Sequence, residues 1–336
     1  MRFENGAYRW RVVSRFQASP DGGGRLLREL DVPGTSMLVR ERAVRIGTNP
    51  PGSLFFEVGT GMAAVITGHS PIEVGVQPFT GSTAYLEALD AGEIDLGVNG
   101  AFDLFAAYHR TDPRYPVVSD VRVLQRGAAI HVGLLVGDDS AIGDLRDLAG
   151  KRVPSGFEPQ RVVSAIMDAS LANAGLSWDD VEAVPVLNTS ESLQALAAGW
   201  LDVAVGAVGA PEVEATDTEV PGGIRFLSVD TSPDAIARMH EIASFDVGWA
   251  DAGPSAGARQ DAALVSYDIY LTASKHLSDN AAYEIVRALW DFDQELLAKG
   301  TQFAGWTRER AADPNAVIPY HSGALRFYRE RRAWAG

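Results

Sequence analysis

Apolar and polar positions along the chain alternate between two kinds of segment. Short runs rich in β-branched residues, such as residues 72–78, are typical of buried strands. They are followed by a turn sequence and then by a segment with apolar residues at helical spacing, such as residues 54–67. Strands are predicted at 43–47, 72–78, 95–98, 121–125, 131–136, 181–186, 201–205 and 266–272. Helices are predicted at 54–67, 83–89, 102–109, 160–174, 190–198, 281–297 and 325–332, with a short helix, turn and strand at 144–153. This alternation predicts an α/β protein with parallel strands and helices on both faces of the sheet.

Two segments of the chain, residues 82–98 and 190–205, resemble each other. They share the pattern apolar-x-Ala-Leu-x-Ala-Gly-x-apolar-Asp, in which the aspartates are Asp95 and Asp202. The pattern predicts a helix capped by Ser82 or Ser190, a glycine that ends the helix, and an aspartate at the start of a buried strand. We expect both aspartates to be structural. Two copies of one unit indicate two similar lobes.

Composition excludes several classes of function. The chain has 336 residues, a net charge of −15 and a pI near 4.8, and both nucleic acids and anionic membrane surfaces require a basic face. A small anionic ligand is not excluded, because a few arginines and helix N-termini can set the potential inside a cleft. Cysteine is absent, which excludes disulfides, thiolate zinc sites, iron–sulfur clusters and cysteine nucleophiles.

No motif indicates catalysis, a metal site or a cofactor. The chain contains no HExxH, GxSxG or Walker sequence and no GxGxxG after a strand. Its six histidines are scattered without metal-like spacing. On one predicted helix, Asp103 and His109 are six positions apart, which does not place them on one face. We therefore predict no catalytic residue, no metal and no cofactor.

The first 43 residues form a polar lead-in in which charges interrupt every apolar run. A secretory signal needs an apolar stretch of about 7–15 residues, so the sequence as written predicts a cytoplasmic protein. No later segment is long and apolar enough to cross a bilayer.

Five motifs in the same order and spacing resemble the TAXI solute receptors of tripartite ATP-independent periplasmic (TRAP) transporters. They are the strand, turn and helix start at 46–56, the turn at 80–83 with the Gly-x-x-Asp sequence at 92–95, the segment 147–153, the Gly-Ala-Pro sequence at 209–211, and the C-terminal signature at 319–328. The resemblance covers residues 44–330. The chain departs from the family pattern at Pro50–Pro51 and in the bulky loop at 154–159, both of which would reshape a pocket.

The resemblance implies a two-lobed type II periplasmic-binding-protein fold of the α/β class. Each lobe would be a mostly parallel sheet flanked by helices, with the ligand cleft between the lobes. We place lobe 1 at residues 44–132 plus 250–336 and lobe 2 at residues 133–249. The implied function is capture of a small anionic or zwitterionic solute, either a glutamate-like amino acid or a small carboxylate, by lobe closure. The implied partner is a TRAP membrane subunit if the chain is exported, which would make it periplasmic, and the expected state is a monomer.

Ligands in such folds lie where helices begin after strands, because helix N-termini offer free N–H groups and a partial positive charge. Three cradles are predicted, at residues 48–55, 80–83 and 155–160. The candidate ligand-binding residues are Thr48, Ser53, Leu54, Phe55, Gly81, Ser82, Thr83, Asn99, Ser155, Gly156, Gln160, Arg161 and Gly209.

Several candidates have a structural alternative. Ser53 and Ser82 fit helix caps as well, Phe55 fits the core, Asn99 fits a turn, and Arg161 fits a solvated helix position. We expect His321 to be a packed, hydrogen-bonded histidine. Two further functions remain open on the same fold: a cytoplasmic enzyme of the decarboxylase or lyase type, and a ligand sensor.

Overall fold

The computed structural model describes residues 42–335, and the predicted lead-in lies outside the described residues except for its last two positions. The strands are β1 (Arg42–Thr48), β2 (Ile72–Pro78), β3 (Leu96–Gly100), β4 (Val121–Gly137), β5 (Arg152–Gly156), β6 (Glu182–Val186), β7 (Ala204–Ala207), β8 (Ile224–Leu227), β9 (Asp246–Ala250) and β10 (Ala262–Ser274). The α-helices are α1 (Leu54–His69), α2 (Ser82–Asp90), α3 (Ala101–His109), α4 (Arg161–Ala174), α5 (Thr189–Ala197), α6 (Pro211–Glu219), α7 (Pro233–Ile242), α8 (Asp279–Asp291), α9 (Asp293–Leu297), α10 (Arg308–Ala311) and α11 (Ser322–Glu330). Short 3-10 helices are η1 (Leu145–Leu148), η2 (Trp178–Asp180) and η3 (Thr301–Phe303). Within the described residues, no helix has the length and apolar character that a membrane crossing needs.

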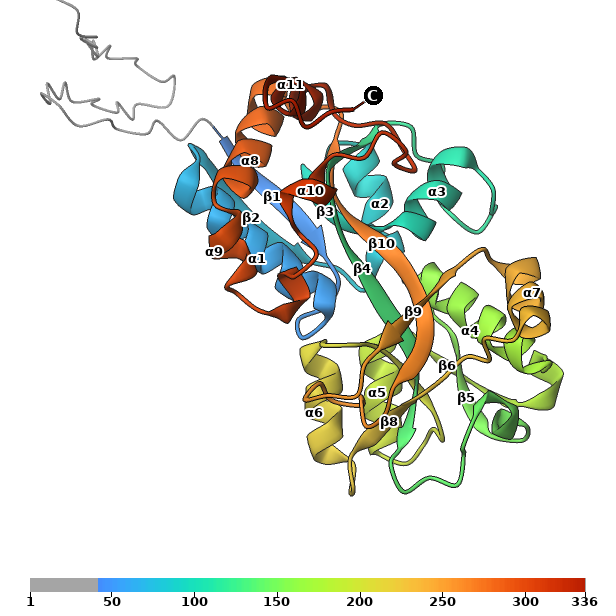
Figure 1. Cartoon of the computed structure of the whole chain (residues 1–336). Coiled ribbons are helices and arrows are strands. Elements are labelled where there is room, and N and C mark those ends of the chain that lie inside the picture. The colour runs from blue at the N-terminus through green and yellow to red at the C-terminus, as the bar shows by residue number, and fades with distance from the viewer. Residues whose placement is uncertain (1–41, 336) are drawn as a thin grey trace, which may run out of the picture. The chain divides into compact units, whose positions relative to one another are not determined.

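The central sheet is organised around its two long strands, β4 and β10. Its order is β2-β1-β3-β10-β4-β7, with β8 also paired to β4 and β9 to β10. The pairs of β1 with β2 and with β3 are parallel, whereas all pairs that involve β4 or β10 are antiparallel. Strands β5 and β6 form a separate parallel pair. The long strands run between one group of helices, α1–α3 and α8–α11, and a second group, α4–α7 (Figure 1).

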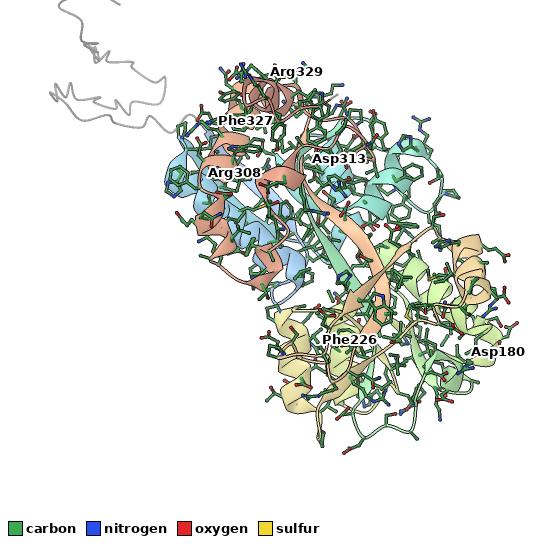
Figure 2. All side chains as sticks on the ribbon, viewed as in Figure 1. Asp180, Phe226, Arg308, Asp313, Phe327 and Arg329 are labelled. Carbon is green, nitrogen blue, oxygen red and sulfur yellow. The ribbon has the colours of Figure 1, made fainter. Side chains whose placement is uncertain are left out.

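Each group of helices has its own buried side chains. Phe226 of β8 and Phe327 of α11, both labelled in Figure 2, are almost fully buried in the two groups. The predicted boundary between residues 132 and 133 falls inside β4. The division of the chain into lobe 1 and lobe 2 at those residues stays a prediction.

The repeated Gly-x-x-Asp unit has one structural role in both copies. The carboxylate of Asp95 accepts the backbone N–H of Arg45 at 3.0 Å, and that of Asp202 accepts the backbone N–H of Arg152 at 2.8 Å. Each aspartate also returns a bond through its own N–H to the carbonyl of the same arginine, at 3.1 Å in both copies. The expected structural role of both aspartates is confirmed: each connects the segment after its helix to a neighbouring strand.

The predicted serine caps of the two repeat helices are wrong. The N-cap of α2 is Gly81, and that of α5 is Asn188, whose side chain accepts the N–H of Glu191. Ser82 and Ser190 lie one and two positions inside their helices, where the Ser82 hydroxyl donates to the buried carboxyl of Asp103 and the Ser190 hydroxyl to the carboxyl of Glu212.

At two places the structure differs from the prediction in whether an element is continuous or interrupted. The strands predicted at 121–125 and 131–136 are one strand, β4, which continues past Gly127 because β10 pairs with it along most of its length. The helix predicted at 281–297 ends as α8 and restarts as α9, because Phe292 leaves the helical conformation (φ −118°, ψ 31°) and stacks on His69 at 3.5 Å. The elements that were not predicted are α6, β8, α7, β9 and α10, together with the 3-10 helices η2 and η3.

Gly127 allows the close packing on the middle of β4. A Cβ atom at this position would overlap the ring of Trp306, which is fully buried. Trp306 is among the largest buried side chains, so it has little freedom to move away.

We predict that Gly127→Ala destabilises the protein by about 1–3 kcal/mol, through overpacking against Trp306. Gly68→Ala is the matched control, because Gly68 lies in α1 with no atom near its would-be Cβ. There the gain in helix propensity should stabilise by up to about 1 kcal/mol. Urea unfolding of the two variants measures both effects, and equal stability of the two would contradict the packing argument.

Candidate functional site

The first turns of five helices surround one small hollow of about 50 Å³. Its lining comprises Asn49, Ser53, Leu54 and Phe55 at the start of α1, Ser82 of α2, Gln160, Val162 and Val163 at the start of α4, Thr189 of α5, Glu212 of α6, and Ile130, Val132, Ala207 and Tyr267 from the strands. We call this hollow the N-terminal cavity. The partial positive charges of several helix N-termini point toward one space.

Five of the predicted residues line the N-terminal cavity: Ser53, Leu54, Phe55, Ser82 and Gln160. Ser53 caps α1, because its hydroxyl accepts the N–H of Phe56 at 3.3 Å. Leu54 and Phe55 are each only 6% exposed. Gln160 is the N-cap residue of α4, and its side-chain oxygen accepts the N–H of Thr189 at 2.9 Å. These residues therefore cap helices or pack in the core and also line the N-terminal cavity.

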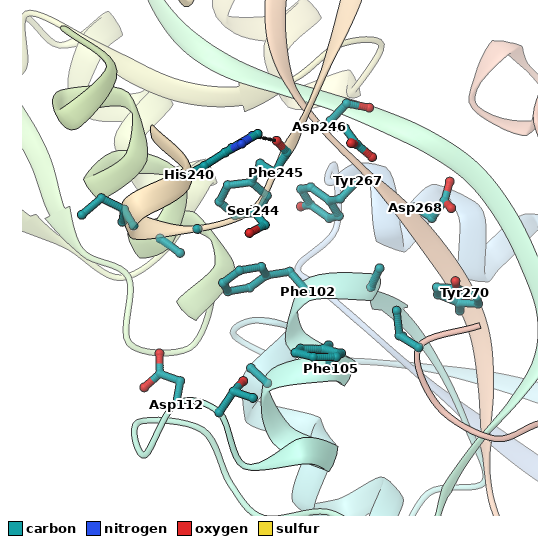
Figure 3. A pocket seen from close by; sticks show the side chains of 18 of the residues that line it. Phe102, Phe105, Asp112, His240, Ser244, Phe245, Asp246, Tyr267, Asp268 and Tyr270 are labelled. Atoms are coloured by element: carbon teal, nitrogen blue, oxygen red, sulfur yellow. Dashed lines mark hydrogen bonds between the residues drawn. The ribbon is translucent and has the colours of Figure 1, made fainter. Parts of the chain in front are cut away.

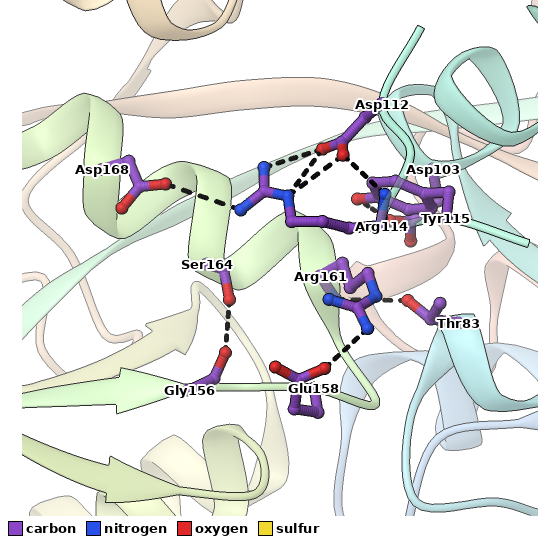
Figure 4. Close-up of polar contacts among 10 residues, drawn as sticks. All are labelled: Thr83, Asp103, Asp112, Arg114, Tyr115, Gly156, Glu158, Arg161, Ser164 and Asp168. Atoms are coloured by element: carbon purple, nitrogen blue, oxygen red, sulfur yellow. Dashed lines mark hydrogen bonds and ion pairs between the residues drawn. The ribbon is translucent and has the colours of Figure 1, made fainter. Parts of the chain in front are cut away.

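Three predicted residues join the two groups of helices by direct contact. The N–H of Thr83 donates to the carbonyl of Pro159 at 3.0 Å, and the Thr83 hydroxyl accepts the N–H of Arg161 at 3.2 Å (Figure 4). A Cβ on Gly81 would overlap the Pro159 carbonyl. Arg161 turns its guanidinium to Glu158 at 2.6 Å. A second main-chain contact of this kind links the N–H of Glu212 to the carbonyl of Gly52 at 3.1 Å.

The other predicted residues do not line the N-terminal cavity. Thr48 ends β1, and its buried hydroxyl has no hydrogen-bond partner within residues 42–335. Asn99 lies inside β3, where its side-chain oxygen accepts the Thr272 hydroxyl at 2.6 Å. Ser155 and Gly156 end β5. Gly209 lies on a different hollow of about 290 Å³.

Glu212 is the acidic side chain of the N-terminal cavity, and sequence reasoning missed it. It occupies the first turn of α6, directly after Pro211. The hydroxyls of Thr189 and Ser190 donate to its two oxygens. Burial raises the pKa of the Glu212 carboxyl, and these two hydrogen bonds oppose the rise. A proline followed by acidic residues is a recognised helix start, so the signal was present in the sequence.

Asp103 lies behind Ser82 and is fully buried. It accepts the hydroxyl of Ser82 at 2.7 Å and that of Tyr115 at 2.8 Å, and the N–H of Val162 in α4 also donates to it. Burial raises the pKa of the Asp103 carboxyl to about 6, against the lowering effect of these three donors. The carboxyl thus connects α3, α2 and the first turn of α4.

The packed histidine predicted at position 321 is confirmed. His321 is 3% exposed, its Nε2 lies 3.0 Å from the carbonyl of Leu277, and its Nδ1 accepts the N–H of Gly323 at 3.2 Å. It caps α11 and lies outside the N-terminal cavity.

We predict that Asp103 makes the protein less stable as the pH rises from about 4 to about 6. The folded state holds this proton more tightly than the unfolded chain, so stability falls through that interval and levels off above it, by on the order of 3 kcal/mol. In Asp103→Asn this component disappears, which urea unfolding of both proteins from pH 4 to pH 7 would measure. Ser82→Ala removes a donor to the ionised form and should steepen the dependence. A pH-independent difference between wild type and Asp103→Asn would contradict the assignment.

Solved structures similar to this chain share its fold at low sequence identity. One is PhnD1 from Prochlorococcus marinus in complex with methylphosphonate, with a TM-score of 0.55, 11% identity, and coverage of 87% of this chain and 98% of that chain. A structure described as a periplasmic transporter has a TM-score of 0.54, 14% identity, and coverage of 88% and 94%. The periplasmic aliphatic sulphonate binding protein SsuA from Escherichia coli has a TM-score of 0.44, 17% identity, and coverage of 77% of each chain. The predicted fold class, a two-lobed periplasmic-binding-protein fold, is confirmed.

No curated protein matches the chain. The sequence model of the NMT1-like family matches residues 46–331. This match spans most of the sequence, and the chain therefore belongs to the NMT1-like family.

Proposed function

We propose that the chain is a solute-binding protein that captures a small zwitterionic or anionic solute by lobe closure at the N-terminal cavity, which at about 50 Å³ lies below the range of about 300–1,000 Å³ typical of ligand pockets and would widen when the lobes open. The convergence of five helix N-termini on one small space carries this proposal. Each N-terminus contributes about half a positive charge and N–H groups without a partner inside the helix. The potential of these N-termini would attract a carboxylate without a lysine or arginine in the lining. The N–H groups of Thr83, Arg161, Thr189 and Glu212 already have partners, so the attraction comes from the helix dipoles more than from these four donors.

The ligand site that we propose keeps the predicted residues and adds three. Ser53, Leu54, Phe55, Ser82 and Gln160 would contact the solute, while Gly81, Thr83 and Arg161 would hold the two groups of helices together over it. The proposal also keeps the predicted residues that do not line the N-terminal cavity, which are Thr48, Asn99, Ser155, Gly156 and Gly209. Asn49, Glu212 and Tyr267 are the additions.

The acceptors in the lining favour a solute that also carries an ammonium group. Glu212 presents a carboxyl whose pKa burial has raised, and an adjacent ammonium would favour its ionised form. The side-chain oxygen of Asn49 is buried and has no hydrogen-bond partner in the described part of the chain. A simple carboxylate would leave the Asn49 oxygen without a donor, which costs free energy, and would place its negative charge beside the Glu212 carboxyl. We therefore favour a glutamate-like amino acid over a plain carboxylate.

We further propose delivery of the solute to a TRAP membrane subunit by a periplasmic, monomeric receptor. The support is the TAXI resemblance over residues 44–330, nearly the same stretch that the NMT1-like family matches. A TRAP membrane subunit encoded beside this chain, and an in-frame signal sequence upstream of Met1, would favour delivery. An enzyme of the decarboxylase or lyase type on the same fold is the alternative, and it differs in consuming the solute.

We predict that glutamate-like amino acids raise the melting temperature and that Glu212→Gln weakens their binding at least tenfold. A ligand at 100 times its Kd stabilises by about 2.7 kcal/mol, which a thermal-shift screen detects. Glutarate lacks the ammonium group of glutamate, so Glu212→Gln should leave glutarate binding unchanged or stronger. Calorimetric titration of both compounds measures the difference.

Glu214→Gln is the matched control, because Glu214 lies on the same helix and is exposed. It should change neither affinity. Equal losses for glutamate and glutarate in Glu212→Gln would overturn the ammonium contact, and failure of every amino acid and small carboxylate to bind would overturn the solute class. Recovery of a bound solute in chemically altered form would replace the receptor with the enzyme.

A further inference from the structure

A second and much larger hollow, of about 670 Å³, lies between α3 and the segment that leads from α7 into β9 (Figure 3). The rest of its lining comes from β4, β10, α4, the loop after α3 and the segment between α10 and α11. Its volume lies within the range of about 300–1,000 Å³ that is typical of pockets for organic ligands. Tyr267 lines both this hollow and the N-terminal cavity. We call it the lateral pocket.

Aromatic side chains form much of the lateral pocket. Phe102 of α3 stacks on Phe245 with ring centroids 4.7 Å apart, and Phe245 lies 6.1 Å from the ring of Tyr267. Phe105 also lines the pocket and is 46% exposed. Figure 3 shows these rings around one open space. Exposed aromatic surface in a concave site is available for a ligand to cover.

The charges of the lateral pocket are predominantly negative. Five carboxylates line it, those of Asp112, Asp168, Asp246, Asp268 and Asp313, against two guanidinium groups, those of Arg114 and Arg126. The only other basic side chain in the lining is His240, whose Nε2 lies 3.0 Å from the carbonyl of Phe245.

Both arginines of the lateral pocket are already paired. Arg114 binds Asp112 at 2.7 Å (Figure 4), and Arg126 binds Asp268 at 2.6 Å and Asp313 at 2.7 Å. Asp246 is exposed and forms no ion pair or side-chain hydrogen bond within residues 42–335. Arg310, which does not line the pocket, also binds Asp268 at 2.7 Å. Among the described residues, the carboxylate of Asp246 is therefore the unpaired charge of the pocket, and it repels an anion and attracts a cation.

We infer that the lateral pocket is a second ligand site, for an organic cation whose ammonium head carries methyl or other apolar groups. The ammonium group would lie against the aromatic faces near Asp246, and its apolar groups would cover Phe105. A cation over an aromatic face contributes about 0.5–1 kcal/mol when exposed and about 2 kcal/mol or more when desolvated. This site shares only Tyr267 with the N-terminal cavity, and it is lined by aspartates and aromatic rings where that cavity is lined by helix N-termini, so it does not rest on the solute proposed above.

The test uses choline as the probe and 3,3-dimethyl-1-butanol, its uncharged isostere, as the comparison. Calorimetric titration of the full chain at low ionic strength should show choline binding at least tenfold more tightly than the isostere. Asp246→Asn and Phe105→Ala should each weaken choline at least threefold, because both side chains are exposed and their loss leaves the core intact.

Asp179→Asn and Trp249→Ala are the matched controls, an exposed aspartate and an exposed aromatic residue outside the pocket, and should leave choline affinity unchanged. Three results would overturn the second site: no choline binding, equal binding of choline and the isostere, or full affinity in both pocket variants. A loss of choline binding in Glu212→Gln, with Asp246→Asn unaffected, would place the cation in the N-terminal cavity and also overturn it. Loss of glutamate binding in Glu212→Gln alone concerns only the first site.

Discussion

Antiparallel hydrogen bonding between β4 and β10 joins the two groups of helices, and both hollows are built against it. Tyr267 of β10 lies opposite Ile130 of β4, and both side chains line the N-terminal cavity. A few residues further along the same pair, beyond an irregularity in the register, Arg126 holds Asp268 in the lateral pocket. A change in the register of these two strands would alter the lining of both sites together.

Much of the fold could be predicted from the sequence because most strands and helices depend on residues that are close together in the chain. The strand at 72–78 and the end of α4 at Gly175 follow directly from periodicity and from glycine at a helix C-terminus. The break at Phe292 was not accessible, since it depends on stacking against His69, more than two hundred positions away in the chain. The pattern for α8 and α9 is continuous in sequence, and a tertiary contact overrides it.

The residues of the candidate site likewise differ in whether the local sequence identifies them. Ser53, Ser82 and Gln160 could be predicted because a helix start is a local feature that recurs after each strand. Asp103 could not, because its burial comes from Ser82, Tyr115 and Val162, which lie on other segments. Considered only against its own helix, Asp103 had no partner at the correct spacing. Glu212 is an intermediate case. The sequence indicates that a helix begins next to it, but it does not indicate which residues surround its side chain.

The two main-chain hydrogen bonds between the groups of helices do not depend on the side chains that line the N-terminal cavity. Thr83 to Pro159 and Glu212 to Gly52 are joined through backbone N–H and carbonyl groups, which side-chain substitution leaves in place. Within the proposed mechanism, mutations in the lining would therefore change selectivity while residence time stays governed by the backbone. On such a scaffold, substitutions in the lining can change which solute binds while the main-chain contacts between the two groups of helices stay the same.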